Sequence, residues 1–331
     1  MDPITHLTSG ALQGQLFRKM IATRWIFLFC GTAALLPDAD NLTGLINPEF
    51  YLIHHRGITH SLLGGVFLSL LLSGLFRLFK ADFPFWRGAV AAYAGILAHI
   101  FLDLITSYGT QIFAPFTRHR YEVACVFIID PFYTLSLLLL FAITCLSRRR
   151  RRVVAVLGLA WLVSYPMINL GVRTGLERSL EGRLSRQGAS FHRIHVTTDA
   201  FTPLFWKVIV ENDSTYSMAV LSLLDPERRL SYETFQKADA GLMKRLGERA
   251  SLFKTYAWFA AYPVMERVNR KGGSAVIFSD LRFHSGLEFV RRRFRGGRVP
   301  FTLTALLDEN GTLVRYEYSR PRSTRFIQHL E

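Results

Sequence analysis

Two ionisable residues, His99 and Asp103, stand four positions apart inside the otherwise apolar residues 88–105. In a helix this spacing places both side chains on one face, where an imidazole and a carboxylate can bind the same metal ion. An ion pair or another satisfied polar contact would also explain the pair. Ionisable groups within a membrane helix are costly and usually functional, so we favour metal binding.

Two polar motifs lie at the ends of other apolar stretches. Leu-Leu-Pro-Asp-Ala-Asp-Asn at residues 35–41 would also suit a helix exit, because Asp and Asn favour turns. His-His-Arg-Gly-Ile-Thr-His-Ser at residues 54–61 would also suit a helix start capped by Thr59. Three histidines and an arginine at one helix end nevertheless favour a functional interpretation.

Long apolar stretches must position these motifs. A membrane helix needs about 20 apolar residues, and the stretches that qualify are residues 58–76, 88–105, 123–146 and 153–172. Residues 25–36 are too short to cross alone, and with residues 4–17 they predict a helical hairpin or a pair of tilted helices. No cleavable signal peptide is expected, because the first stretch lacks a basic start and a cleavage site.

Basic residues predict the orientation of these helices. The larger set of connections holds Arg18, Lys19, Arg24, Arg77, Lys80, Arg87 and the run Arg148 to Arg152, and the opposite set holds Arg56, Arg118 and Arg120. The positive-inside rule assigns the larger set to the cytoplasm. The chain beyond residue 172 then lies outside the cytoplasm.

The same orientation of the helices places the candidate residues near the outer ends of their segments. These are Asp38, Asp40, His54, His55, His60, His99, Asp103 and Asp130, with His6 added if the first segment runs inward. Asp130 is either an acceptor for a metal ligand or the acid that starts a helix. Imidazoles and carboxylates together suit zinc, with manganese or iron as alternatives, and one to three ions are expected.

At these residues the sequence resembles the YdjM-type family of bacterial inner-membrane, metal-dependent hydrolases. The matching elements, in order, are Thr5-His6, Leu-Leu-Pro-Asp-Ala-Asp at 35–40, His-Arg-Gly-Ile-Thr-His-Ser at 55–61, Leu-Ala-His-Ile-Phe-Leu-Asp-Leu-Ile-Thr at 97–106, and Gly109. That family is distantly similar to the all-helical zinc-dependent phospholipase C and single-strand nuclease fold. The resemblance implies phosphoester hydrolysis and suggests His6, Asp40, His60, His99 and Asp103 as ligands.

From motifs and resemblance together we predict roles for nine residues. The predicted metal ligands are His6, Asp40, His55, His60, His99 and Asp103, and the predicted catalytic residues are Asp38, Arg56 and Thr59. The metal would activate a water molecule, whose pKa a bound zinc ion lowers to about 7. The planar fork of Arg56 would hold an anionic oxygen, most naturally of a phosphate.

The chain after Gly171 predicts a short linker and one α+β domain. Residues 204–211 and 216–223 flank Asn-Asp-Ser, and residues 301–307 and 312–318 flank Glu-Asn-Gly, which are hairpin signals. A helical stretch is expected at residues 232–265. Basic residues exceed acidic ones here, among them Arg291, Arg292, Arg293, Arg295 and Arg298. A solvated face, or a lid or lipid-headgroup dock over the metal site, would account for them.

The predicted fold class is therefore an α-helical integral membrane bundle of about four to six helices (residues 1–172) followed by a small extracytoplasmic α+β domain (residues 173–331). The net charge of +15 would suit nucleic acid, but between membrane spans it indicates topology and contact with anionic headgroups. Membrane lipids and a lipid-linked or anionic phosphate substrate are the expected partners, without nucleic acid. The alternatives to a hydrolase are a metal transporter or sensor and a non-enzymatic membrane scaffold.

Overall fold

A computed structural model describes residues 1–21, 25–147, 149–293, 299–319 and 326–329. Arg24, Arg148, Arg295 and Arg298, whose charges enter the predictions above, lie outside the described residues. The chain divides into a helical unit and a sheet unit. The helical unit holds Met1–Leu42, His54–Val172 and Phe201–Pro203, and the sheet unit holds Thr43–Ile53, Arg173–Ala200 and Leu204–Glu331.

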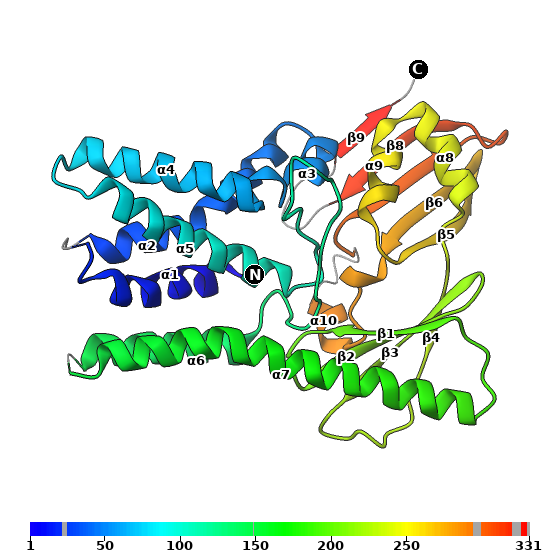
Figure 1. Cartoon of the computed structure of the whole chain (residues 1–331). Helices are drawn as coiled ribbons and strands as arrows, with labels where there is room; N and C mark the ends of the chain where they lie inside the picture. Colours follow the sequence, from blue (N-terminus) through cyan, green and yellow to red (C-terminus); the bar gives the residue numbers. More distant parts are fainter. Residues whose placement is uncertain (22–24, 148, 294–298, 320–325, 330–331) are drawn as a thin grey trace. The chain divides into compact units, whose positions relative to one another are not determined.

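The helical unit is a bundle whose longer helices lie side by side (Figure 1). Its elements are α1 (Pro3–Phe17), α2 (Ile26–Leu35), η1 (Leu36–Leu45), η2 (Ile58–His60), α4 (Leu62–Phe79), α5 (Phe85–Leu104), α6 (Pro131–Leu146) and α7 (Arg151–Arg186). Among the described residues α4, α5 and α7 are long and apolar enough to cross a membrane. Helix α1 packs against α2, α5 and α6, so it lies at the centre of the contacts between helices.

Helices α1 and α2 form an antiparallel hairpin in which small residues allow close contact. A Cβ atom added to Gly10 would lie 2.4 Å from the carbonyl oxygen of Cys30 and 2.8 Å from the Cβ of Ala34. One turn further along, Gly14 faces Phe27 in the same way. Of the two arrangements that the sequence left open, the hairpin is the one observed.

We therefore expect Gly10→Ala to destabilise the bundle, even though alanine favours a helix. Overpacking of this kind costs about 1–3 kcal/mol, because backbone on α2 would have to move. Gly175→Ala on α7 is the matched control, since nothing lies within 4 Å of its added Cβ. Thermal unfolding in detergent should show a lower midpoint for Gly10→Ala than for Gly175→Ala, and equal midpoints would contradict the close packing.

The apolar residues 123–146 do not form one helix, so the predicted 24-residue span is wrong. Helix α6 begins only at Pro131, because Asp130 caps it by accepting a hydrogen bond from the Tyr133 backbone N–H at 3.0 Å. Proline suits the first turn of a helix, where its missing N–H has no partner to lose. Asp130 is thus a helix-start acid, and it also accepts a hydrogen bond from the Tyr165 hydroxyl at 2.7 Å.

The predicted linker after Gly171 is also wrong, because α7 continues without a break to Arg186. The division between the two units falls between Val172 and Arg173, inside this helix. Beyond it the sequence becomes charged but keeps helical spacing, as the Arg173–Glu177 ion pair at i and i+4 shows (3.2 Å). A change from apolar to polar composition marks the end of a membrane stretch, and here it does not mark the end of the helix.

The described residues of the sheet unit form two antiparallel sheets in which each strand pairs with the next along the chain. The first holds β1 (Arg193–Thr198), β2 (Phe205–Glu211), β3 (Thr215–Ser222) and β4 (Glu233–Gln236), and the second holds β5 (Pro263–Arg270), β6 (Gly273–Asp280), β7 (Thr302–Leu307), β8 (Leu313–Ser319) and β9 (Phe326–His329). Its helices are α3 (Pro48–His54), α8 (Ala240–Arg249), α9 (Ser251–Phe259), η3 (Leu281–Phe283) and α10 (Glu288–Arg293).

Both predicted hairpins are confirmed, as β2–β3 and β7–β8. The helix predicted for residues 232–265 is right only in its middle, where α8 and α9 lie. Its first part is strand β4, which pairs with β3, and its last residues begin β5. The boundary is set by Asp239, whose carboxylate accepts hydrogen bonds from the Gly241 and Leu242 backbone N–H groups and so starts α8.

Candidate metal centre

Four donor atoms from three elements of the helical unit meet at one end of the bundle. Asp38 comes from η1 after α2, His60 ends η2 before α4, and His99 and Asp103 lie in the last turns of α5. One donor atom from each of these residues lies within 4.8 Å of all the others. His60, His99 and Asp103 are buried, whereas the side chain of Asp38 is 25% exposed.

The spacing of these donors fits a tetrahedral metal ion. His60 Nε2 lies 2.9 Å from His99 Nε2, and Asp103 Oδ2 lies 3.1 Å and 3.5 Å from these two atoms. Asp38 Oδ1 is 3.7 Å and 3.8 Å from the same nitrogens. Ligands about 2.0–2.1 Å from a central zinc ion stand about 3.4 Å apart at tetrahedral angles. These five separations scatter around that value, and the whole group of donor atoms lies within 4.8 Å.

The hydrogen bonds of the two imidazoles turn their lone pairs toward one another. His99 Nδ1 lies 2.6 Å from the carbonyl oxygen of Ala34, which can only accept, so this nitrogen carries the proton. His60 Nδ1 lies 3.0 Å from the carboxylate of Asp40 and donates in the same way. In the neutral rings both Nε2 atoms are then acceptors facing two further acceptors, the carboxylates of Asp38 and Asp103. Such a group of atoms is stable only around a positive charge.

The carboxylates around His60 and Asp38 change the pKa values of both groups in the direction that favours positive charge. Burial by itself lowers the pKa of His60, but the neighbouring carboxylates of Asp103, Asp38 and Asp40 outweigh it and raise the pKa to about 10. Burial likewise acts to raise the pKa of Asp38, whereas the imidazole of His60, 3.7 Å from its Oδ1 atom, lowers it to about 2. The surrounding carboxylates therefore favour a cation at the position where the four donors meet.

Asp40 holds the residues that precede α4. Its Oδ1 atom is 2.7 Å from His55 Nδ1, and its Oδ2 atom accepts from the Arg56 backbone N–H at 2.9 Å and from the Thr59 hydroxyl at 2.7 Å. Burial acts to raise the pKa of Asp40, but the hydrogen bonds from His55 and His60 hold it well below its usual range. Asp40 is therefore an ionised carboxylate that orients His60 from the side away from Nε2.

Arg56 is buried and bound to Asp103. Its Nη2 atom lies 2.9 Å from Asp103 Oδ1, and its Nη1 atom donates to the Asp103 carbonyl at 3.1 Å and to the Thr106 hydroxyl at 2.8 Å. The guanidinium lies over the ring of Tyr108, 4.9 Å from its centroid, and Arg120 lies over the same ring. These contacts hold the carboxylate of Asp103 in place.

His6 packs against the ring of His99. The two rings stack with centroids 3.8 Å apart and an interplanar angle of 20°. His6 is fully buried, and neither of its ring nitrogens makes a hydrogen bond within the described part of the chain. Its Nε2 atom lies 3.3 Å from Asp103 Oδ1, the carboxylate oxygen that also contacts Arg56.

The structure thus brings all nine predicted site residues to one end of the helical unit. Only some of them are among the converging donors. Asp38, predicted to be catalytic, is one of the four converging donors, whereas His6, Asp40 and His55 are not among them. His55 contacts Asp40 and packs edge-on against Tyr108. The sequence reasoning missed Tyr108, Thr106 and Arg120, and the backbone acceptor at Ala34, for which a sequence holds no signal.

The helices and the His/Asp cluster define a helical membrane protein with a possible metal site. The chain belongs to the YdjM inner membrane protein family, whose sequence profile matches residues 1–174. It is also 34% identical over 155 residues to Uncharacterized protein YfhP of Bacillus subtilis (strain 168). That match covers 43% of this chain and 46% of the relative, so the chain aligns with about half of that protein. No solved structure matches the chain.

Proposed function

We propose that the protein is a membrane-bound, metal-dependent hydrolase that cleaves a phosphoester of a lipid or cell-envelope compound with metal-activated water. The observation that carries the proposal is the convergence of four acceptor atoms, from Asp38, His60, His99 and Asp103, within 4.8 Å of one another. Membership of the YdjM family agrees with a membrane location. The resemblance of that family to zinc-dependent phospholipase C and single-strand nucleases suggests the phosphoester.

The place of the cluster favours an enzyme over a transporter. A transporter tends to hold its ions near the middle of the membrane, often where helices are broken. Here the donors lie at helix ends and in the segments between helices, and Asp38 is in contact with solvent. A water molecule and a substrate can approach from the side of Asp38, whose Oδ1 atom stands farthest from the two imidazoles. A non-enzymatic scaffold would have no use for the buried donors.

Zinc suits two imidazoles and two carboxylates best, with manganese or iron as alternatives. His60, His99 and Asp103 would hold the first ion, and its fourth position, next to Asp38, would be open to water. The expected number is one to three, and His6, beside the other oxygen of Asp103, would serve a second. A bound divalent ion polarises a phosphoryl oxygen and makes water a nucleophile near neutral pH.

The residues around these donors hold them in place. Asp40 fixes the tautomer of His60, and Thr59 donates its hydroxyl to Asp40. Asp38, the exposed donor, is the residue that meets the reacting water and substrate. Arg56, which the sequence suggested as a phosphate contact, is held on Asp103, so we propose that it acts by positioning that ligand.

The test is metal analysis of the purified protein followed by phosphoester hydrolysis assays in lipid and detergent. We expect about one tightly bound divalent ion per chain or more, and hydrolysis that a chelator abolishes and zinc restores. If the protein binds none of the metals tested, both the hydrolase and the transporter are excluded. If the protein binds metal and carries that metal into vesicles, but hydrolyses no class of phosphoester, the transporter would be favoured.

The site and the C-terminal domain are proposed to face the extracytoplasmic side of the bacterial inner membrane. The proposal depends on the basic connections, such as those at Arg77 and Arg149 to Arg152, being cytoplasmic. A reporter fused after residue 331 should be active outside the cytoplasm, and one inserted within residues 149–152 should be active inside. The reverse pattern would overturn the sidedness and leave the metal site unaffected.

A further inference from the structure

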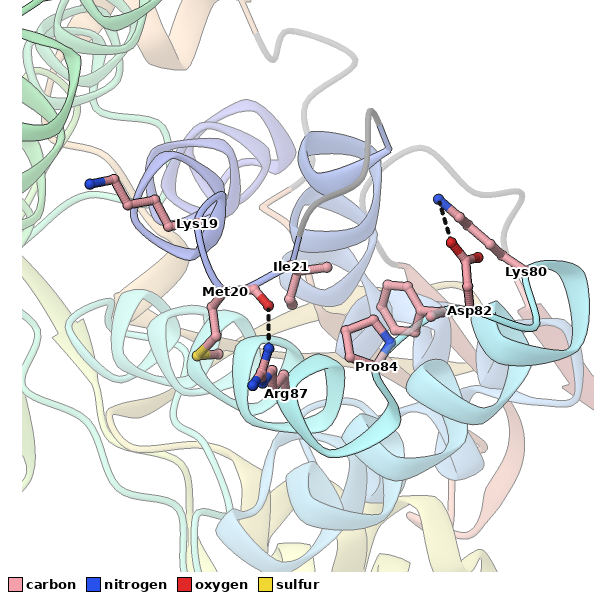
Figure 2. Close-up of a pocket in the computed structure, with 8 residues that line it drawn as sticks. Lys19, Met20, Ile21, Lys80, Asp82, Pro84 and Arg87 are labelled. Carbon is pink, nitrogen blue, oxygen red and sulfur yellow. Dashed lines mark hydrogen bonds and ion pairs between the residues drawn. The ribbon is translucent and has the colours of Figure 1, made fainter.

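A cavity of about 300 Å³ opens at the end of the bundle opposite the metal donors (Figure 2). It lies where α1 ends and where α4 is joined to α5. Its lining residues are Lys19, Met20, Ile21, Lys80, Asp82, Phe83, Pro84 and Arg87. All of them belong to the helical unit.

The position of this cavity is set by the length of α5. Arg87 and Asp103 stand sixteen residues apart on that helix, so they are about 24 Å apart along its axis. The hydrocarbon core of a bilayer is about 30 Å thick. When the metal donors lie at one membrane surface, the cavity therefore lies at the level of the headgroups in the other leaflet.

The cavity is lined by more positive than negative charge. Lys19, Lys80 and Arg87 carry three positive charges, and Asp82 carries the single negative one. Lys80 Nζ is 3.8 Å from an oxygen of Asp82 whose side chain is 77% exposed, so solvent weakens this pair. Arg87 reaches the carbonyl oxygen of Met20 only at 3.5 Å, and Lys19 extends outward at the rim (Figure 2).

Large apolar side chains beside the cavity point to lipid. Phe79 is 91% exposed, Leu78 is 82% exposed and Trp86 is 73% exposed, and each is close in sequence to Lys80 or Arg87. Exposed aromatic residues at the ends of membrane helices form the belt that faces the headgroup region. The cationic cavity and its apolar surroundings thus match the two parts of a lipid molecule.

We propose that this cavity binds the headgroup of an anionic phospholipid, with the acyl chains along the outer surfaces of α4 and α5. The phosphate would lie between Lys80 and Arg87, with the charge of Lys19 at the rim, and Trp86 and Phe79 would contact the glycerol and the first methylenes. Ligand pockets usually measure about 300–1,000 Å³, so a cavity of this size suits a headgroup rather than a whole lipid. The lipid is a ligand here and not the substrate, because the metal donors lie at the other end of α5.

The experiment is native mass spectrometry of the delipidated full chain, titrated separately with phosphatidylglycerol, phosphatidylcholine and inorganic phosphate. The test variant is the triple change Lys19→Gln, Lys80→Gln and Arg87→Gln. The matched control removes three charges outside the cavity by Arg77→Gln, Arg149→Gln and Arg150→Gln. Each residue of the test variant would lose a direct charge-assisted contact with the lipid phosphate, which the control residues do not make, so we expect the test variant to bind phosphatidylglycerol about a hundredfold more weakly.

The control variant should bind phosphatidylglycerol within about threefold of the parent chain. Equal loss of phosphatidylglycerol binding in both triple variants would show that diffuse surface charge attracts the lipid. That result would overturn the proposed binding in the cavity. Equal binding of phosphatidylcholine would overturn the requirement for an anionic lipid. Inorganic phosphate that binds as tightly as the lipid would assign the cavity to free phosphate instead. Metal content is expected to be the same in all three proteins, so the result is independent of the proposed hydrolase.

Discussion

Alanine in place of His99 or Asp103 should strip the protein of its metal while leaving it in the membrane. Each residue supplies one of the four converging donors, and both are buried in α5. Removal of a residue that merely orients a ligand costs 10–100-fold in metal affinity, so loss of a ligand should cost more than about a hundredfold. Insertion should persist, because the change makes α5 more apolar. Metal content by atomic spectroscopy and membrane fractionation measure the two effects.

Two exposed residues serve as matched controls. His119→Ala and Asp82→Ala remove the same side chains from positions outside the cluster. Both controls should keep the metal of the parent chain. Unchanged metal in both His99→Ala and Asp103→Ala would mean that these residues form a structural pair, and the tetrahedral arrangement would then have another cause.

Much of the candidate site could be predicted from the sequence, because its residues carry two strong signals. Ionisable side chains are costly in an apolar helix, so His99 and Asp103 stood out at once. The i, i+4 spacing then placed them on one face. The motifs holding Asp38 and His60 could be joined to them only because alternate helix ends return to the same membrane surface.

The exact partners could not be predicted, because they depend on which atom faces which. The sequence ranked Asp40 as a ligand and Asp38 as a catalytic residue. In the structure Asp40 lies at Nδ1 of His60 and Asp38 lies near Nε2, a difference set by two positions in η1. The fold errors have a similar source, since composition alone suggested a span through residues 123–130 and a linker at Gly171. The cap at Asp130 and the continuing helical spacing decided both.

Arg56 offers the sharpest distinction between binding a substrate and holding a ligand. If its fork met the substrate, Arg56→Ala would keep its metal and lose about a hundredfold in turnover. Its Nη2 atom instead lies 2.9 Å from Asp103 Oδ1, and its Nη1 atom is shared by the Asp103 carbonyl and Thr106. We therefore expect Arg56→Ala to bind metal 10–100-fold more weakly.

The measurement that separates the two roles is turnover as a function of added metal. A positioning role predicts that excess zinc restores most of the turnover of Arg56→Ala, because the remaining donors are intact once the ion is bound. Arg56→Lys should lie between the two proteins, since an ammonium group supplies charge to Asp103 but cannot form the fork. Turnover that stays about a hundredfold low at saturating zinc, with a raised KM for an anionic phosphoester, would instead place the guanidinium on the substrate. In that case the ion pair with Asp103 would have to open when substrate binds, and Arg56→Ala would keep the metal affinity of the parent chain.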